Sequence, residues 1–215
     1  MKLIQWIGLF VWMSIANVHA QQMDTLFYQK RIDEELFSRI QGKSYKEGCT
    51  VPLSDLRYLK VMHYNGKGKV CRGELICHRS ISDDLLDIFH KLYEAKYPIE
   101  RMVLVDEYEA DDEASMADNN SSAFNFRYIS GTRSLSRHSL GMAIDINPFY
   151  NPYVRKRGGK TLVSPNGAEG YTERTKDFPY KIDHNDLCYK LFKAHGFTWG
   201  GDWKNSKDYQ HFEKR

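Results

Sequence analysis

The sequence has little net charge, and its basic residues are not gathered in one region. Its 31 lysines and arginines nearly balance its 28 aspartates and glutamates. Nucleic-acid-binding proteins usually concentrate positive charge in a patch or stripe. The nearest approach to such a patch, residues 155–157, is short and is followed by two glycines, a pattern typical of a solvated loop tip. We therefore expect no nucleic-acid partner.

Cysteine is also scarce, and none of it is arranged as Cys-x-x-Cys. This absence argues against a zinc ribbon and against a thioredoxin-type redox site. The four cysteines are Cys49, Cys71, Cys77 and Cys188, enough for two disulfides in an oxidising compartment. Cys71 and Cys77 lie in one expected strand, where six extended residues span about 20 Å. That span exceeds the reach of a disulfide, so these two are not expected to pair, and the remaining pattern stays open.

The sequence has a single long apolar run, at its start. Lys2 precedes the run at residues 3–16, and Val18-His19-Ala20 then forms a small-x-small cleavage signature. This order predicts a signal peptide at residues 1–20. A retained anchor is the alternative, but the run is shorter than the roughly 20 residues that a bilayer span needs. We expect an exported protein, periplasmic or extracellular, without stable membrane insertion after cleavage.

The rest of the chain is long enough for one domain with its own core. Residues 21–41 are interpreted as an N-terminal helical segment, since Leu36, Phe37 and Ile40 have helical spacing, and residues 42–215 as the main domain. Further patterns predict a hairpin over 56–78, helices from Ser82 to before Pro98 and from Asp183 to Gly196, strands at 102–105, 123–129, 142–146 and 209–213, and loops at 109–122 and 148–179. Strands and helices do not alternate regularly. The predicted class is α+β, with a small antiparallel sheet and flanking helices.

Two short segments contain the residues best suited to chemistry. Residues 136–145 read Ser-Arg-His-Ser-Leu-Gly-Met-Ala-Ile-Asp, and residues 208–213 read Asp-Tyr-Gln-His-Phe-Glu. Two histidines and one carboxylate make a catalytic zinc set that leaves a position for water. His138 and Asp145 are seven residues apart, so an unbroken strand would point them to opposite faces. A turn at Gly141 resolves this conflict, and the small Ala143 leaves space beside Asp145.

Each of these residues also has an ordinary explanation. A single histidine before a strand is more often a surface residue than a ligand. Asp145 is harder to explain in that way, because it lies in an apolar run and burying an unpaired carboxylate costs several kcal/mol. His211 lies near the C-terminus between Tyr209 and Phe212, a context that favours burial. We therefore predict that Asp145 is buried against a cation.

The pattern Ser-x-His-x-x-Gly-x-Ala-x-Asp, followed near the C-terminus by Asp-x-x-His, resembles the metal and base signature of a known family. The family comprises zinc D-alanyl-D-alanine carboxypeptidases and L-alanyl-D-glutamate endopeptidases, which share a fold with lysostaphin-type peptidases and the hedgehog domain. The resemblance extends from about residue 42 to residue 211, and includes residues 98–99, 119–127, 145–148, 151–153 and 196–201. It implies that the predicted antiparallel sheet carries a zinc site.

The resemblance also implies a role for each residue that matches the motif. His138, Asp145 and His211 would hold Zn²⁺, and Asp208 would be the general base. Arg127 would stabilise the tetrahedral oxyanion, although Arg133 and Arg137 lie close by in sequence, and an exposed strand arginine is the ordinary alternative. Ser136 and Glu213 are candidates to orient His138 and His211 by hydrogen bonding.

The function that the resemblance implies is hydrolysis of an amide bond in a peptidoglycan stem peptide by an exported zinc metallopeptidase, expected to be a monomer. The bond type, D,D-carboxypeptidase or L-Ala-D-Glu endopeptidase, stays open. One alternative is a non-catalytic, zinc-stabilised cell-wall-binding or signalling domain on the same fold. Asp208 favours the enzyme, because a structural zinc site needs no base. A second alternative is a phosphoesterase or other metal hydrolase, with additional carboxylates from residues 106–118.

Overall fold

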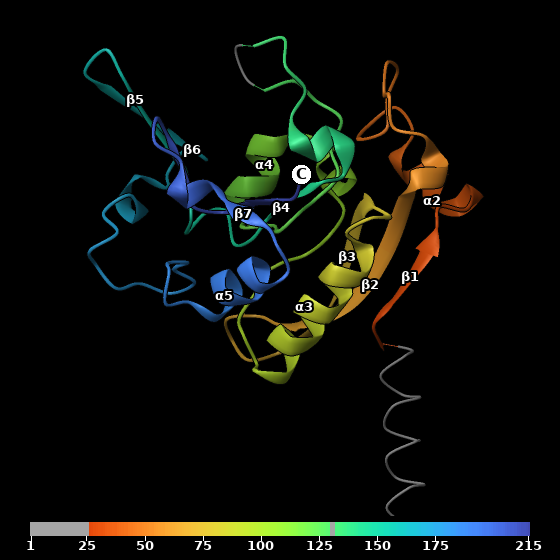
Figure 1. Cartoon of the computed structure of the whole chain (residues 1–215), viewed down its shortest axis with the longest axis horizontal. Coiled ribbons are helices and arrows are strands. Elements are labelled where there is room, and N and C mark those ends of the chain that lie inside the picture. Colours follow the sequence, from red (N-terminus) through yellow and green to blue (C-terminus); the bar gives the residue numbers. More distant parts are fainter. Residues whose placement is uncertain (1–25, 130–131) are drawn as a thin grey trace, which may run out of the picture.

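The computed structural model describes residues 26–129 and 132–215. The predicted signal peptide lies outside the described residues, and so does the boundary that cleavage would create. Within the described part, no helix is both long and apolar enough to cross a membrane. In residues 26–129 and 132–215, four α-helices and three small antiparallel sheets form a single α+β domain, which confirms the predicted class (Figure 1).

The largest sheet comes from the N-terminal half and has the order β1-β2-β3. Its strands are β1 (Tyr28–Arg31), β2 (Leu56–Tyr64) and β3 (Val70–His78). The hairpin predicted over 56–78 is confirmed, with the Asn-Gly-Lys-Gly turn at 65–68 between β2 and β3. β3 contains both Cys71 and Cys77, and all four cysteines are free thiols.

Neighbouring residues of this sheet face opposite sides, and each side is covered. Leu75 and Cys77 join one buried cluster with helix α3 (Ser82–Glu94), whereas Ile76 joins a second with helix α2 (Glu34–Ile40). β1 precedes α2 within the segment interpreted as helical and pairs with β2. The division of the chain at residues 41 and 42 stays a prediction.

Two helix starts differ slightly from those expected. Ser82 is the first residue of α3 rather than its cap, and its Oγ donates to the Arg79 carbonyl oxygen. The cap of helix α5 (Leu187–Ala194) is Asp186, not Asp183, because the Asp186 carboxylate accepts the exposed N–H groups of the first turn.

The second sheet carries the site, and it has the order β4-β9-β7. Its strands are β4 (Ala143–Asp145), β9 (His211–Glu213) and β7 (Thr198–Trp199). Helix α5 covers it, with the rings of Phe192 and Phe212 stacked 4.3 Å apart between centroids. Strands were predicted near both β4 and β9, and each is shorter than expected.

The strand predicted at 102–105 is absent. Residues 102–104 have no regular secondary structure, and a 3-10 helix, η2 (Val105–Tyr108), begins at Val105. The Asn120 side chain takes the place of a neighbouring strand: its Oδ1 accepts from the Val103 N–H at 2.8 Å, and its Nδ2 donates to the Val103 carbonyl at 3.1 Å. An apolar run predicts burial, but it does not reveal that an amide will satisfy its backbone.

The loop predicted at 109–122 contains helix α4 (Asp112–Ala117). Asp111 caps it by accepting from the Ala114 N–H, and Asp112 and Glu113 occupy its first turn. Acidic residues in that position favour a helix start, so this composition was misinterpreted as loop. The strand predicted at 123–129 is irregular instead, with Phe124 and Phe126 buried but Asn125 buried as well.

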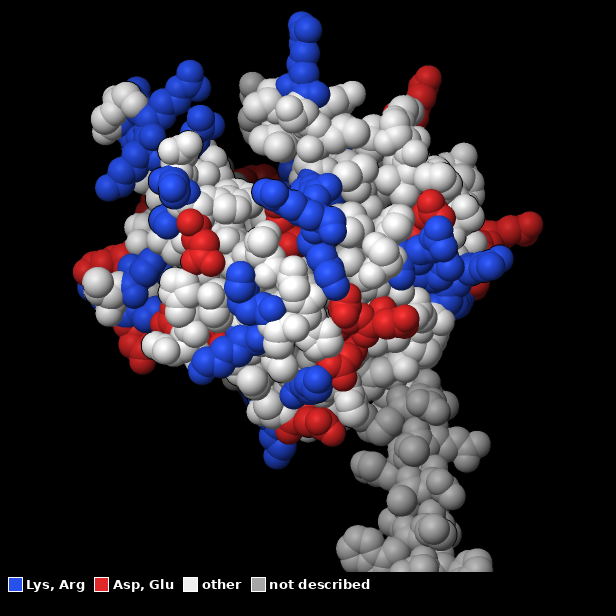
Figure 2. Space-filling view, viewed as in Figure 1, with Lys and Arg blue, Asp and Glu red and all other residues white. Residues whose placement is uncertain are grey.

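The loop predicted at 148–179 contains a second hairpin. Its strands β5 (Tyr153–Arg157) and β6 (Lys160–Ser164) form a third sheet with β8 (Lys207–Asp208), in the order β6-β5-β8. The hairpin projects from the body of the domain (Figure 1). Its basic residues are exposed at the projecting end, where they form a blue group in Figure 2, in agreement with a solvated tip.

Candidate metal centre

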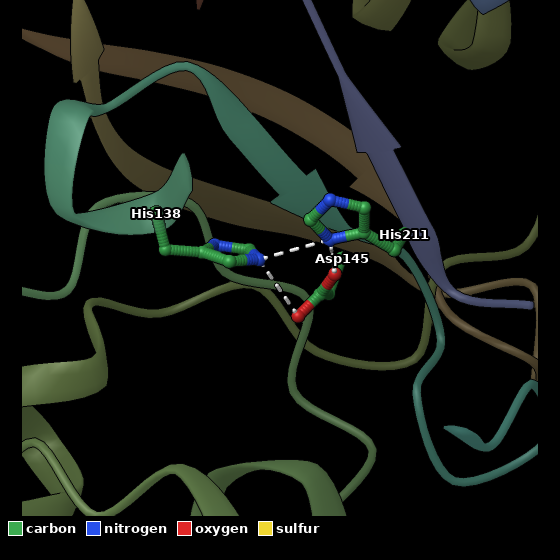
Figure 3. A group of neighbouring side chains, drawn as sticks. All are labelled: His138, Asp145 and His211. Atoms are coloured by element: carbon green, nitrogen blue, oxygen red, sulfur yellow. Dashed lines mark hydrogen bonds and ion pairs between the residues drawn. The ribbon is translucent and has the colours of Figure 1, made fainter. Parts of the chain in front are cut away.

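Three predicted ligands, two from the second sheet and one from the segment before β4, come together. His138, Asp145 and His211 offer ligand atoms that all lie within 4.8 Å of one another, and their side chains point toward a common centre (Figure 3). His138 Nε2 lies 3.2 Å from Asp145 Oδ2, His211 Nδ1 lies 3.0 Å from Asp145 Oδ1, and the two nitrogens are 3.1 Å apart. All three residues are buried, with 3%, 7% and 5% exposure respectively.

Local backbone geometry brings His138 back toward β4. His138 lies in a 3-10 helix, η3 (Arg137–Leu140), which ends at Gly141 in the left-handed conformation with φ of +65°. A Cβ at Gly141 would lie 2.6 Å from the His78 backbone nitrogen. The turn predicted at Gly141 is therefore confirmed, and both its φ and the close approach of β3 require glycine.

The two imidazoles are held so that they present different nitrogens to the centre. His138 Nδ1 donates to the Ala123 carbonyl oxygen at 2.6 Å, which leaves Nε2 facing Asp145. His211 Nε2 lies 3.2 Å from Glu213 Oε2, so Nδ1 faces the centre. A hydrogen bond to the outer nitrogen fixes the tautomer and orients the ring, as is usual for histidine ligands.

The charges of the centre favour a cation. Burial raises the pKa of Asp145, but the imidazoles of His138 and His211 more than offset it and hold that pKa well below its usual range. Burial lowers the pKa of His211, yet its bonds to Asp145 and Glu213 raise it to about 10. A metal ion that binds here takes the place of the proton on His211, because a histidine ligand must be neutral. Two nitrogen donors and one carboxylate oxygen match the donor set of a three-ligand zinc site, so these residues fit the metal.

Asp208 lies in β8, close to the centre but outside the group of three. Burial raises the pKa of its carboxyl to about 6, with His211 lowering it and Asp145 raising it. Its Oδ1 is buried and has no hydrogen-bond partner among the described residues. A buried carboxylate oxygen without a partner costs free energy, and it is free to accept a proton from a bound molecule.

The other predicted site residues have different contacts. Arg127 forms an ion pair with Asp112 through Nε, and its backbone N–H donates to Ser139 Oγ at 2.8 Å. Ser136 Oγ accepts from the backbone N–H of His138 at 3.3 Å, so it supports the η3 turn rather than the imidazole ring. Glu213 contacts the His211 ring, as expected for an orienting residue.

Sequence reasoning missed two groups that shape the site. The Ala123 carbonyl orients His138, and no side-chain pattern reveals a backbone acceptor. Asp112 pairs with Arg127, and it was overlooked because its segment was interpreted as loop. The acidic pair Asp112-Glu113 directly after Asp111 was a signal for a capped helix start that would have ordered these carboxylates.

Comparison with known proteins gives one family. Residues 130–214 match the model of a family described as D-alanyl-D-alanine carboxypeptidase, and these residues contain η3 and all three sheet strands of the centre. No solved structure matches the chain. The match indicates a hydrolytic metallopeptidase, in accord with the donor set of the centre. Residues 130–214 are thus similar to the D-alanyl-D-alanine carboxypeptidases, which supports the family resemblance of the motifs.

Proposed function

We propose that this protein is an exported zinc metallopeptidase that hydrolyses an amide bond in the peptide part of peptidoglycan. The observation that carries the proposal is the buried group of His138, Asp145 and His211, with Asp208 beside it but not part of it. A purely structural zinc site has no use for a neighbouring carboxyl whose buried Oδ1 has no hydrogen-bond partner within residues 26–129 and 132–215.

The residues divide the chemistry between them. Zinc in a three-ligand site supplies a Lewis acid that polarises a carbonyl and acidifies water. Asp208 accepts the proton of the attacking water and passes it to the leaving amine. The raised pKa that burial gives this carboxyl suits the task, because it makes the carboxylate a stronger base. Arg127 balances the negative charge that develops on the carbonyl oxygen.

The centre has groups that keep it in one arrangement. Ala123 and Glu213 orient the two imidazoles, and Gly200 lets the chain approach Asp208 closely, since a Cβ there would lie 2.6 Å from the Asp208 carbonyl oxygen. Preorganised groups of this kind lower the barrier because they need no rearrangement during the reaction. Export is proposed from the leader at residues 1–20 and from the location of the substrate.

Digestion of purified peptidoglycan tests the proposal. The zinc-loaded protein is incubated with sacculi, and the released peptides are identified by mass spectrometry, with a chelator-treated sample as control. We expect zinc-dependent release of D-alanine or of stem peptides, and no cleavage of casein. Vigorous hydrolysis of ordinary L-peptides without release from sacculi would contradict the proposed substrate. Stoichiometric zinc without any hydrolysis would instead support a binding domain.

A further inference from the structure

Two carboxylates in the first turn of helix α4 bind two separate segments next to the candidate site through hydrogen bonds and an ion pair. The Asp112 carboxylate accepts from Asn125 Nδ2 at 2.9 Å through Oδ1 and pairs with Arg127 Nε through Oδ2. The neighbouring Glu113 accepts from Ser164 Oγ at 2.9 Å and from the Asn166 N–H. Two adjacent carboxylates of one short helix therefore hold two segments that are far apart in the sequence.

Both of these segments contact elements that carry candidate site residues. Asn125 lies beside η3, because its backbone N–H donates to the His138 carbonyl at 3.2 Å. Ser164 pairs with Tyr153, and Tyr153 pairs in turn with Asp208. Later in α4, Met116 Sδ accepts a hydrogen bond from Gln210 Nε2 at 3.4 Å. In the sequence, Gln210 lies between Asp208 and His211. Helix α4 is thus a common support for the predicted oxyanion group and the predicted base.

The contact between Asp112 and Arg127 is built rather than incidental. Both side chains are 29% exposed, so the pair is mostly shielded from solvent. Arg127 is held along its backbone as well, since Ser139 Oγ accepts from its N–H and donates to its carbonyl at 2.6 Å. The contact at Nε is an ion pair and not a hydrogen bond, because Nε has no hydrogen-bond partner among the described residues. The terminal nitrogens are the donors that remain for a ligand. Arginine has many rotamers, and fixing one of them before the ligand binds reduces the conformational entropy that is lost on binding.

We propose that Asp112 is a positioning residue: it holds Arg127 through Nε and so orients the terminal guanidinium nitrogens toward the developing oxyanion. This inference rests on the proposed function and deepens it, because it names the group that fixes the least constrained member of the site. Asn125 has the supporting role of fixing the second oxygen of the Asp112 carboxylate.

The first test measures the contact itself and needs no catalysis. Arginine Nε–Hε signals are recorded by nuclear magnetic resonance on the zinc-loaded chain, with Arg127→Lys used to assign the Arg127 signal. We expect the Arg127 signal to shift in Asp112→Asn, because that substitution removes the negative charge beside Nε. Glu109→Gln is the matched control, since it removes one charge nearby from a side chain that is 76% exposed. An Arg127 signal that is unchanged in Asp112→Asn would overturn the proposal whatever reaction the protein catalyses.

The second test asks whether Asp112 acts through Arg127. Rates on a soluble stem peptide are compared for Asp112→Asn, Arg127→Ala and the double variant. We expect Asp112→Asn to lower kcat by roughly tenfold to hundredfold with little change in KM, because misplaced groups lose about that much. In the Arg127→Ala background the same substitution should change kcat less than about twofold, since it then has nothing to position. If the fold-change in kcat of the double variant equals the product of the two single fold-changes, Asp112 acts independently of Arg127, and the proposal is overturned.

Zinc content and thermal midpoint are measured on every variant. If Asp112→Asn does not fold, Asp112→Glu replaces it, because it keeps the charge at the helix start and moves the carboxylate by one methylene. The same change in the Arg127 signal and a lowered kcat are expected, and a fully active Asp112→Glu with an unshifted signal would contradict the inference. Failure of the proposed function is distinguishable, since a wild-type chain without hydrolysis leaves the first test intact.

Discussion

Asp145 lies directly opposite His211 in the antiparallel ladder of β4 and β9, and its Oδ1 is 3.0 Å from His211 Nδ1. The register of these two short strands therefore determines the relative position of two of the three predicted ligands. A slip by one residue would send one of these side chains to the other face of the sheet. The stacked rings of Phe192 and Phe212 hold that register from the opposite side.

The centre predicts one tightly bound zinc per chain. Removal of either imidazole leaves two protein ligands, so His138→Ala and His211→Ala should each lose stoichiometric zinc. Elemental analysis after dialysis measures this. Metal that binds only the folded chain also stabilises it, by about 1.4 kcal/mol for each tenfold excess of free metal over Kd, so a chelator should lower the thermal midpoint of the wild-type protein only. Stoichiometric zinc in both variants would refute the ligand assignment.

We predict that a side chain at position 200 would overpack the site beside Asp208. A Cβ at this position would lie 2.6 Å from the Asp208 carbonyl oxygen and 3.2 Å from His211 Cβ. Gly200→Ala should therefore lower the free energy of unfolding by about 1–3 kcal/mol, as overpacking usually does, and should reduce activity. Gly170→Ala is the control, because a Cβ there meets no atom within 4 Å. Urea titration of both variants makes the comparison, and equal stabilities would argue against this close approach.

The sequence was most informative where a local pattern carries its own geometry. The β2–β3 hairpin followed from its Asn-Gly turn, α3 from its apolar face, and the return of His138 from Gly141. It was least informative where long-range contacts satisfy a polar group. At Val103, where a partner strand was expected, the Asn120 side chain bonds the backbone instead, and Asp112 meets Arg127 only through the fold.

His63 predicts a pH dependence of stability that is separate from the metal centre. Burial lowers its pKa, and its Nδ1 donates to the Ile99 carbonyl at 2.7 Å. The folded state therefore favours the neutral ring. Below the unfolded pKa of about 6.5 the unfolded chain binds a proton that the folded chain does not, so stability is complete above that pH and falls as the pH drops.

The variant His63→Gln keeps a hydrogen-bond donor and removes the titration. Its unfolding free energy should fall less than that of the wild type between pH 7.5 and pH 5, where one proton contributes at most about 1.4 kcal/mol per pH unit. Urea titrations at several pH values give the difference, and contributions from the metal centre cancel because both proteins share it. Parallel pH curves for the two proteins would show that His63 does not contribute.

Asp208 separates an enzyme from a zinc-stabilised binding domain. Its Oδ1 is buried beside the ligands and has no hydrogen-bond partner in the described part of the chain, so as a base Asp208 must reach the attacking water without holding the metal. Asp208→Asn keeps the size of the side chain and one acceptor oxygen, and it removes the proton acceptor. Base catalysis is typically worth about 10² to 10⁴ in rate, so kcat should fall by at least that order while zinc content and thermal midpoint stay unchanged. Measurements of all three quantities on one preparation decide between the roles. Full activity would place the base elsewhere, with Glu213 the next candidate, because its carboxylate contacts His211 and it is not one of the three predicted ligands. Loss of zinc would make Asp208 a ligand or a support that the centre needs in order to form.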